Sequence, residues 1–556
     1  STCQVEHSIF FVPLAAKKMR CILEVNPNDF LLTKTILTHL FISKRMETVM
    51  NNHLTYIEEP KLKFAHNQSA EDSRDGLTLF GPYQSVGGSS TIRAGYVGTQ
   101  VGLEYYHTFV MQMNRPIYTK SLGRPFFPGF KSVFGIDWSP DPSAKIILQE
   151  EDLQVALSIP NLKERTYSLV SLYLDAIKRY IDDEESVIDI WYVIVPNTVL
   201  TLCRSKSVSG KPTYSKRRIE TFNSGQISFF EEENEDISQY AEMYESDSDF
   251  HDQLKARAIF NRITCPIQIM LQSTLQFHNK VSGEEYNDDM KAHLAWTHSS
   301  SLYYKLGYLP WKLDSIRDGV CYVGLVFKKL QETGRRRGYA CSAAQMFLDS
   351  GDGDVFRGNI GPWLSSDEKT FHLDRASAKA LLSIAIEAYY TKHKGYPKEL
   401  FIHGRTAFID SEWRGFQDAI QETPNTNLVG VTIKENSGFR LLRDNSDPKS
   451  QYGVLRGLCL YVNEKSGYLW TKGFIPKTET ANQMQVARPL QIEISSGHDD
   501  ISTVIRDILS LTKLNYNACI YGDGLPVTLR FSDKIGDILT AIPEVNWAAK
   551  PFKYYI

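Results

Sequence analysis

The chain of 556 residues lacks several features that would assign it to a common class of protein. Its eight cysteines include no Cys-x-x-Cys pair, which argues against a structural zinc site and fits free thiols in a reducing cytoplasm. No apolar run approaches the roughly 20 residues of a membrane span, and no clear signal peptide is present. The formal net charge of −3 excludes a uniformly basic nucleic-acid-binding protein, so any nucleic-acid site must be a local groove. We therefore expect a cytoplasmic protein without a membrane segment.

The composition is otherwise that of a globular protein, with 42% hydrophobic and 23% charged residues. Its length predicts two to four domains. Predicted strands and helices alternate along most of the chain, which is typical of an α/β protein. The main predicted strands are 91–99, 187–196, 319–329, a hairpin within 334–356, 399–408 and 428–435, and the main helices are 101–114, 166–181, 374–395 (ended by Gly395) and 411–420.

Two segments of biased charge lie between the predicted elements. Residues 204–218 form a basic loop, which is either solvated or in contact with a nucleic-acid backbone. Residues 231–249 are strongly acidic, and we expect an exposed linker that lies away from any phosphate. Nearer the start, Phe80-Gly81-Pro82 indicates, on local pattern alone, a strand followed by a turn.

Three predicted elements could bring cationic and polar side chains together. His251 and Lys255 are four residues apart, so on a helix they share one face. Gln268 lies in a short apolar strand, and Lys305 lies in a second predicted helix. An imidazole, a carboxamide and two ammonium groups would suit a terminal phosphate. The more common alternative is that these side chains are simply solvated on helix surfaces.

The order of these residues, followed by Pro310-Trp311-Lys312, resembles the MID domain of Argonaute proteins. The stretch 508–539, with Leu514-Asn515-Tyr516-Asn517 and Leu525-Pro526-Val527-Thr528, resembles the end of the Argonaute PIWI domain. The resemblance implies an α/β protein in which a Rossmann-like MID domain precedes an RNase H-like PIWI domain. The implied boundaries are an N-terminal extension of undecided status at 1–53, a linker segment at 54–85, the MID domain at 86–308 and the PIWI domain at 309–556.

The resemblance also implies a binding site for the 5′ phosphate of a guide strand. Its implied residues are His251, Lys255, Gln268 and Lys305, together with the terminal carboxylate of Ile556, which would help to hold Mg²⁺ at the phosphate. Many family members carry Tyr or Arg where His251 stands. Stacking and direct bonding therefore both remain open for this residue.

The carboxylates of an RNase H-like nuclease, which hold two divalent ions, are missing at two positions. Where the family has Gly-Ile-Asp, this chain has Gly324-Leu325-Val326, and where it has His-Arg-Asp-Gly, this chain has His403-Gly404-Arg405-Thr406. We therefore predict that the chain has no catalytic residues and binds nucleic acid without cutting it. The alternative is a nuclease with relocated carboxylates, drawn from Asp349, Asp352, Asp354 and Glu412, although Gly351 and Gly353 favour a hairpin turn for the first three.

Segments such as LTLFGP and HLAWT look most like short prokaryotic Argonautes that pair with a TIR–APAZ protein. This resemblance implies a guide RNA, a single-stranded DNA target and a heterodimer that forms a higher oligomer when target binds. The partner's TIR domain would then hydrolyse NAD⁺ in defence against plasmids or phages. A further alternative is a guided binding protein with a different effector partner, or with none.

Overall fold

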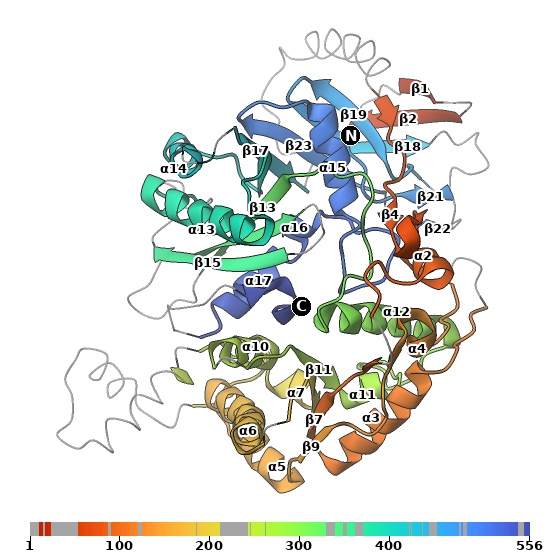
Figure 1. The fold of residues 1–556 in the computed structure, drawn as a ribbon, viewed down its shortest axis with the longest axis vertical. Helices are drawn as coiled ribbons and strands as arrows, with labels where there is room; N and C mark the ends of the chain where they lie inside the picture. Colours follow the sequence, from red (N-terminus) through yellow and green to blue (C-terminus); the bar gives the residue numbers. More distant parts are fainter. Residues whose placement is uncertain are drawn as a thin grey trace, which may run out of the picture.

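The computed structural model shows two α/β units, one below the other in the view of Figure 1. It describes residues 10–14, 17–23, 54–86, 90–120, 125–184, 186–211, 243–244, 246–261, 263–329, 340–348, 353–361, 371–421, 423, 425–435, 438–443, 453–476, 480–481, 486–542 and 550–556. The predictions for Asp349, Asp352, part of the basic loop and most of the acidic segment lie outside these residues.

The lower unit is built on a four-stranded parallel sheet. Its order is β11 (Ile267–Leu271), β10 (Ile190–Val195), β7 (Ala94–Gly98) and β9 (Ala144–Ile147). Every residue of β10 is buried, because helices cover both faces of the sheet. One face packs against α5 (Glu150–Ser158), α6 (Leu162–Asp183) and α10 (Phe250–Phe260), and the other against α3 (Gln100–Met113) and α12 (Asp288–Lys305). The predicted strands and helices of this unit are thus present.

The upper unit is built on a ten-stranded mixed sheet. Its order is β24 (Lys550–Pro551), β15 (Gly353–Gly361), β14 (Ala340–Leu348), β13 (Val320–Lys329), β16 (Glu399–Gly404), β17 (Asn427–Lys434), β23 (Leu490–Ser496), β20 (Ser466–Leu469), β19 (Leu458–Asn463) and β3 (Leu54–Tyr56). The central strands β13, β16 and β17 are parallel, and β14 forms the predicted hairpin with β15. One face packs against α13 (Arg375–His393) and α14 (Asp410–Ile420), and the other against α15 (Ile501–Leu511), α16 (Val527–Arg530) and α17 (Ser532–Leu539).

A single hydrophobic core continues from one unit into the other. The rings of Tyr304 on α12 and Tyr516 in the upper unit stack with their centroids 4.5 Å apart. Phe552, near the last residue, packs edge-on against Phe347 of β14 at 5.2 Å. Figure 1 accordingly places the chain's last residue at the junction of the two units. Packing of this kind fixes the two units relative to each other, and hence the shape of any cavity between them.

Buried ion pairs attach the linker segment to the upper unit. The carboxylate of Glu59 lies 2.9 Å from Arg456 Nε and 2.7 Å from Lys513 Nζ, and all three side chains are almost fully buried. Nearby, β4 (Leu62–Lys63) pairs with β12 (Lys312–Leu313) and β5 (Ser69–Ala70). Removing one member would leave an uncompensated buried charge, so the linker is an integral part of the fold.

Two local predictions are wrong. Before the Gly81 turn the chain forms a helix, α2 (Ser73–Phe80), rather than a strand, because Asp72 caps it by accepting from Arg74 N at 2.8 Å. The long helix α13 ends at His393 and is capped by Lys394, whose φ of +55° is left-handed, and not by Gly395. The first error concerns the type of element and the second a helix end, and in each case one side-chain bond or one residue's φ decides the outcome.

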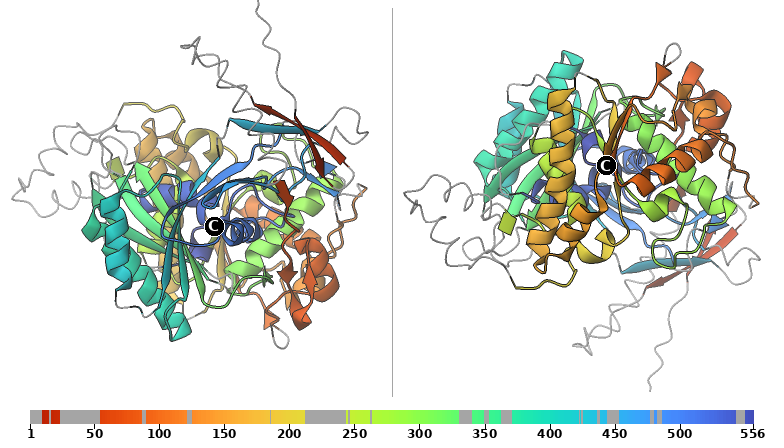
Figure 2. Two further views of the ribbon diagram at one scale, coloured as in Figure 1. Left: turned by 90° about the horizontal axis from the view of Figure 1, so that it is seen from above. Right: turned by 90° about the horizontal axis from the view of Figure 1, so that it is seen from below.

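The extension left undecided by the sequence contains a β-hairpin. Strands β1 (Phe10–Leu14) and β2 (Lys17–Leu23) pair with each other, and β2 pairs with β18 (Phe439–Arg443). Figure 2 shows this hairpin at the periphery of the molecule, beside β18. The remaining elements are η1 (Ala65–Asn67), β6 (Ser90–Thr91), α4 (Phe130–Phe134), β8 (Ile136–Asp137), α7 (Val199–Leu202), α11 (Gln272–Leu275), β21 (Phe474–Ile475), β22 (Thr480–Ala481) and η4 (Phe552–Tyr554).

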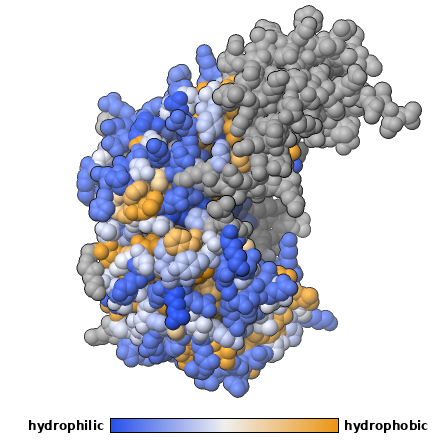
Figure 3. Space-filling view, turned by 90° about the vertical axis from the view of Figure 1, so that its right-hand side faces the viewer, coloured by the Kyte–Doolittle hydropathy of each residue, from blue (hydrophilic) through white to orange (hydrophobic). Residues whose placement is uncertain are grey.

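The face drawn in Figure 3 is largely hydrophilic, with apolar residues scattered among polar ones. Within the described ranges, no helix is both long enough and apolar enough to cross a membrane. Cys203, Cys265, Cys321, Cys459 and Cys519 are buried free thiols.

Candidate functional site

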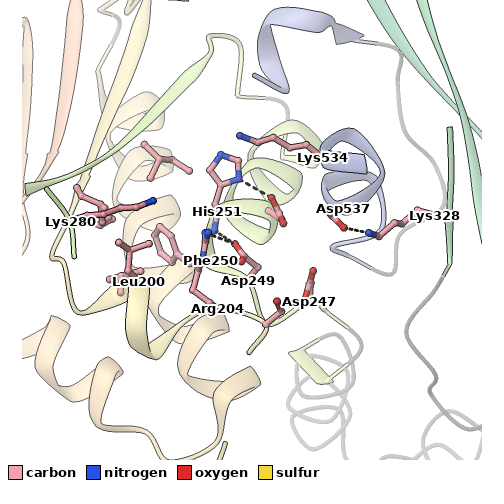
Figure 4. Close-up of a pocket in the computed structure, with 16 residues that line it drawn as sticks. Leu200, Arg204, Asp247, Asp249, Phe250, His251, Lys280, Lys328, Lys534 and Asp537 are labelled. Atoms are coloured by element: carbon pink, nitrogen blue, oxygen red, sulfur yellow. Dashed lines mark hydrogen bonds and ion pairs between the residues drawn. The ribbon is translucent and has the colours of Figure 1, made fainter. Parts of the chain in front are cut away.

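A cavity of about 870 Å³ opens beside α10, where the two units meet (Figure 4). We call it the junction cavity. Its walls come from the end of β10 and the residues after it, from the start of α10, from β11 and from α17 of the upper unit. The lining residues are Val195, Val199, Leu200, Arg204, Ser205, Asp247, Asp249, Phe250, His251, Asp252, Ile269, Leu271, Lys280, Lys328, Lys534 and Asp537.

His251 lies in the first turn of α10 and faces this cavity. The helix starts there because Asp249 accepts a hydrogen bond from the backbone N–H of His251 at 3.1 Å. The Nδ1 atom of His251 lies 2.8 Å from Asp252 Oδ1. Burial, and then the charge of Lys255, hold the pKa of His251 well below its usual range. His251 therefore offers the cavity a neutral ring rather than a second cation.

The other predicted side chains form two contacts next to His251. Lys305 Nζ donates to Gln268 Oε1 at 2.5 Å, which joins the end of α12 to β11. Lys255 Nζ donates to the backbone oxygen of Tyr555 at 3.1 Å and to the terminal oxygen of Ile556. The structure therefore brings together the residues that the sequence places on α10, β11, α12 and the last turn, and of these only His251 lines the junction cavity itself. Their role in binding stays a prediction.

Lys534 on α17 completes a cluster of three lysines that sequence reasoning did not identify. Burial, and then the charge of Lys534, lower the pKa of Lys305 to about 7. Burial and then the charges of Lys305 and Lys534 hold the pKa of Lys255 well below its usual range. Lys534 is the one lysine on the short helix α17, whose Ile535, Ile538 and Leu539 are buried. Its position next to the apolar residues of this helix was the sequence signal that could have identified it.

We call Lys255, Lys305 and Lys534 the cationic cluster. Lys255 and Lys305 are 3% and 2% exposed. Among the residues that the structure describes, none of the three ammonium groups forms an ion pair with a carboxylate side chain. The terminal carboxylate of Ile556 is one anionic partner, of Lys255, and Gln268 is a neutral partner of Lys305. Three ammonium groups beside one carboxylate leave a positive charge that suits an anionic ligand.

Four carboxylates also line the junction cavity. Two of them contradict the expectation that the acidic segment is an exposed linker. Asp247 and Asp249 end the acidic segment, yet they face the cavity, and Asp249 is 8% exposed. Asp247 N donates to the backbone oxygen of Ala541 at 2.8 Å, and this bond holds the segment against the upper unit. Burial, and then the charge of Asp252, raise the pKa of Asp249 to about 6. The end of the acidic segment is thus part of the cavity wall and not an exposed linker.

A second, smaller cavity of about 220 Å³ lies at the carboxyl end of β16. We call it the sheet-edge cavity. Its lining residues are Leu325, Phe327, Phe371, Gly404, Arg405, Thr406, Phe408, Glu412, Ser532 and Asp533. Arg405 Nη2 lies 3.2 Å from Asp533 Oδ2 across the cavity wall. His403, just before it, is buried and shares a 2.9 Å hydrogen bond with Thr528 Oγ1.

Of the carboxylates considered as relocated metal ligands, the two that the structure describes, Asp354 and Glu412, bond to different partners. Glu412 Oε1 accepts from Leu373 N at 3.1 Å, and its Oε2 lies 3.4 Å from His372 Nδ1. Asp410 is exposed and pairs with Arg414 at 2.7 Å. Asp354 pairs with Lys392 at 2.7 Å. Over the described ranges, no group of three or more His, Cys, Asp or Glu residues is arranged to hold a metal ion.

The predicted Mg²⁺ at Ile556 does not fit the surroundings of that residue. The terminal oxygen of Ile556 already accepts a hydrogen bond from the Lys255 ammonium group. Hard divalent ions need several oxygen ligands, and the nearby charges of Lys305 and Lys534 would repel a cation there. We therefore assign no step to a metal ion at this position.

The fold is similar to that of several solved structures. The Argonaute of Clostridium butyricum, bound to a guide DNA and a 19-mer target DNA, matches with a TM-score of 0.58 at 12% identity, over 90% of this chain and 54% of that chain. Drosophila Piwi matches with a TM-score of 0.54 at 13% identity, over 90% of this chain and 56% of that chain. A. aeolicus Argonaute matches with a TM-score of 0.52 at 13% identity, over 97% of this chain and 66% of that chain.

The fold is that of the Argonaute and Piwi proteins. The predicted fold class, a Rossmann-like MID domain followed by an RNase H-like PIWI domain, is thereby confirmed. No protein-family model and no curated protein sequence matches the chain. The chain spans 54% of the Clostridium Argonaute and 56% of Drosophila Piwi. The domain boundaries predicted from the sequence stay predictions.

Proposed function

We propose that the junction cavity and its cationic cluster bind the 5′ phosphate of a guide RNA. The observation that carries this proposal is the burial of the Lys255 and Lys305 ammonium groups next to half-buried Lys534. All three have lowered pKa values, and none forms an ion pair with a carboxylate side chain of the described residues. A phosphate would neutralise their mutual repulsion and accept charge-assisted hydrogen bonds from Lys255, Lys305 and Lys534. The solved Argonautes bound to a guide DNA or to siRNA support nucleic acid as the ligand class.

The polar residues beside the cluster would orient the guide's first nucleotide. Gln268 positions Lys305 through its 2.5 Å hydrogen bond. His251, a neutral ring facing the cavity, is suited to stacking on a base more than to ion pairing. Ile556 positions Lys255 through its terminal oxygen. Guide pairing with single-stranded DNA would then supply the sequence specificity, as in other guided systems.

We further propose that the chain recognises its target without cutting it. Val326 and Arg405 stand where the sequence resemblance expects carboxylates. Glu412 bonds to the backbone of Leu373 and to His372. A two-metal nuclease site needs several converging carboxylates, and the described part of the sheet-edge cavity contains only Glu412 and Asp533.

The partner in this proposal is a TIR–APAZ protein, which forms a heterodimer with the chain and a higher oligomer when target binds. Target pairing would activate NAD⁺ hydrolysis in the TIR domain, in prokaryotic defence against plasmids or phages. This part rests on the sequence resemblance to short Argonautes. The second candidate, a guided binding protein with another effector, makes the same use of the junction cavity.

Guide binding is tested by comparing two RNAs of one sequence, with a 5′ phosphate and with a 5′ hydroxyl. We expect the phosphorylated guide to bind at least about tenfold more tightly, because each charge-assisted bond contributes about 1.5–3 kcal/mol. Equal affinity for the two guides would show that the cationic cluster does not bind the phosphate.

The partner is tested by measuring NAD⁺ in a mixture of the chain, its TIR–APAZ partner and a guide RNA. We expect NAD⁺ to fall only after complementary single-stranded DNA is added. Unchanged NAD⁺ would reject the TIR assignment, and assay of the same mixture for cut DNA would then test the nuclease alternative.

A further inference from the structure

The sheet-edge cavity is lined by a cation, Arg405, in the segment where the sequence resemblance expects a carboxylate. Arg405 follows the last strand residue of β16, Gly404, so the sheet directs it to the carboxyl edge. Its guanidinium contacts Asp533 through two nitrogens, at 3.2 and 3.4 Å, and Ser532 Oγ at 3.4 Å. The two charged side chains are 45% and 70% exposed, so solvent reaches the pair.

An ion pair with this exposure contributes little to stability. Exposed pairs gain modest Coulomb energy, lose side-chain entropy and are screened by salt. The contact lengths of 3.2–3.4 Å are also longer than those of strong charge-assisted hydrogen bonds. Arg405 can therefore exchange Asp533 for another anion at low cost.

Glu412, the other carboxylate in the cavity, does not compete with a ligand for Arg405. Glu412 is 1% exposed and accepts from Leu373 N at 3.1 Å. Burial raises the pKa of Glu412. The remaining wall includes the rings of Phe327, Phe371 and Phe408. Such a wall suits the apolar face of a sugar, next to one cation for its phosphate.

We propose that the sheet-edge cavity binds a backbone phosphate of the target strand, and that Arg405 exchanges Asp533 for this phosphate when the target pairs with the guide. A planar guanidinium can hold two phosphate oxygens at once. In this role the arginine supplies the positive charge that a nuclease obtains from metal ions, and it supplies no reactive water. The inference rests on the proposed function, because it requires a guided target strand.

The test uses guide-loaded protein and a series of DNA targets, each with one uncharged methylphosphonate linkage. We expect one linkage, or two neighbouring ones, at which loss of the charge weakens target binding of the wild-type protein by about tenfold. In Arg405→Gln that local sensitivity disappears, and the variant binds unmodified target about tenfold more weakly. Arg375→Gln serves as the matched control, because Arg375 is 57% exposed and pairs with Asp418 outside the cavity.

A second variant acts in the opposite direction. Asp533→Asn removes the competing anion, so we expect target binding to tighten by several-fold. A gain in affinity cannot result from misfolding, so this variant keeps the inference testable even if Arg405→Gln folds poorly. Each target titration is preceded by the guide comparison with 5′ phosphate and 5′ hydroxyl, which neither variant should change.

The outcomes separate the two proposals. If the wild-type protein binds the 5′-phosphate and 5′-hydroxyl guides equally well, the proposed function itself is overturned. Intact preference with the same methylphosphonate profile in wild type and Arg405→Gln would overturn this inference alone. Weaker target binding by Asp533→Asn would also overturn it, because that carboxylate would then assist the target rather than compete with it.

Discussion

The two cavities share α17 as a wall, yet their charges are arranged in opposite ways. Beside the junction cavity, Lys255 and Lys305 are buried and Lys534 lines the wall. None of the three has a carboxylate side chain as a partner among the described residues. In the sheet-edge cavity, Arg405 has Asp533 and Glu412 has the Leu373 amide and His372. The lysines beside the first cavity repel one another, and an anion would relieve that repulsion, whereas the charged groups of the second cavity are paired. Buried cations without a side-chain counter-ion therefore favour the first cavity as the stronger candidate for anion binding.

The largest effect should follow from removing the charge of the first cavity. In Lys255→Ala combined with Lys305→Ala, we expect binding of the 5′-phosphorylated guide to weaken by at least about a hundredfold. Binding of the 5′-hydroxyl guide should change much less, so the two guides should become nearly equivalent. Direct titration of both guides measures this difference.

Lys379→Ala is the matched control for that double variant, because Lys379 is exposed on α13 and lines neither cavity. It should keep the full preference for the 5′ phosphate. An equal loss for both guides in the double variant would indicate general damage to the fold rather than loss of a phosphate contact.

The next effect concerns pH. Lys305 has a pKa of about 7 in the free protein, and a bound phosphate would favour its charged form and raise that value. Guide binding should therefore take up a proton, and affinity for the 5′ phosphate should fall as pH rises from about 7 to 9. In Lys305→Met the affinity should depend less steeply on pH. In Lys534→Met the decrease in affinity should move to higher pH, because one charge that repels Lys305 is gone. Affinities measured over this range test the effect, and an unchanged slope in Lys305→Met would contradict it.

The stability of the free protein should depend on pH with the opposite sign. The folded pKa of Lys305, about 7, lies below the unfolded value near 10.4, so the unfolded chain binds more protons between these values. The contribution of Lys305 to stability therefore increases as pH rises through that window. Denaturant unfolding without guide, for wild type and Lys305→Met, checks the sign.

A smaller effect tests whether the second cavity is only structural. Glu412→Ala should lower the free energy of unfolding by about 1–3 kcal/mol, because the buried Leu373 amide loses its acceptor. Asp410→Ala, at an exposed pair on the same helix, should leave unfolding unchanged. Guided cleavage that is present in the wild type and lost in Glu412→Ala would instead support the relocated-carboxylate nuclease.

The last prediction is that a single added carboxylate leaves the protein without guided cleavage. Val326→Asp restores one carboxylate at a position where the family has Asp, but one carboxylate cannot hold two divalent ions. We expect no guided cleavage with Mg²⁺ or Mn²⁺. Any guide-dependent cut product would show that the second cavity is closer to a nuclease site than its side-chain bonds indicate.

The elements that the sequence predicted correctly are those with strong periodicity. The strand at Ile190–Val195 and the helix at Leu162–Asp183 follow from apolar spacing alone. Lys255, Gln268 and Lys305 were singled out because their order resembles the Argonaute MID domain, and each lies on such an element. Lys534 was missed because it approaches the others only when the upper unit packs on the lower one, and no local spacing encodes that contact.

The prediction that the acidic segment ending at Asp249 is an exposed linker was wrong for a related reason. Its composition is that of a solvated linker, and composition averages over the whole segment. Only its last residues are buried, because Asp249 caps α10 and Asp247 bonds to the upper unit. The side chains that close a cavity between two units are thus the ones least visible in local sequence.

The position of Asp533 and Lys534 on α17 has a consequence for how the proposed guide and target strands would influence each other's binding. Successive residues on a helix project roughly 100° apart, so these neighbours face different cavities on one short rigid element. Binding linkage is reciprocal: whatever factor the guide's first phosphate adds to target affinity, the target must return to guide retention. A guide that has found its complement would then be the one least able to leave.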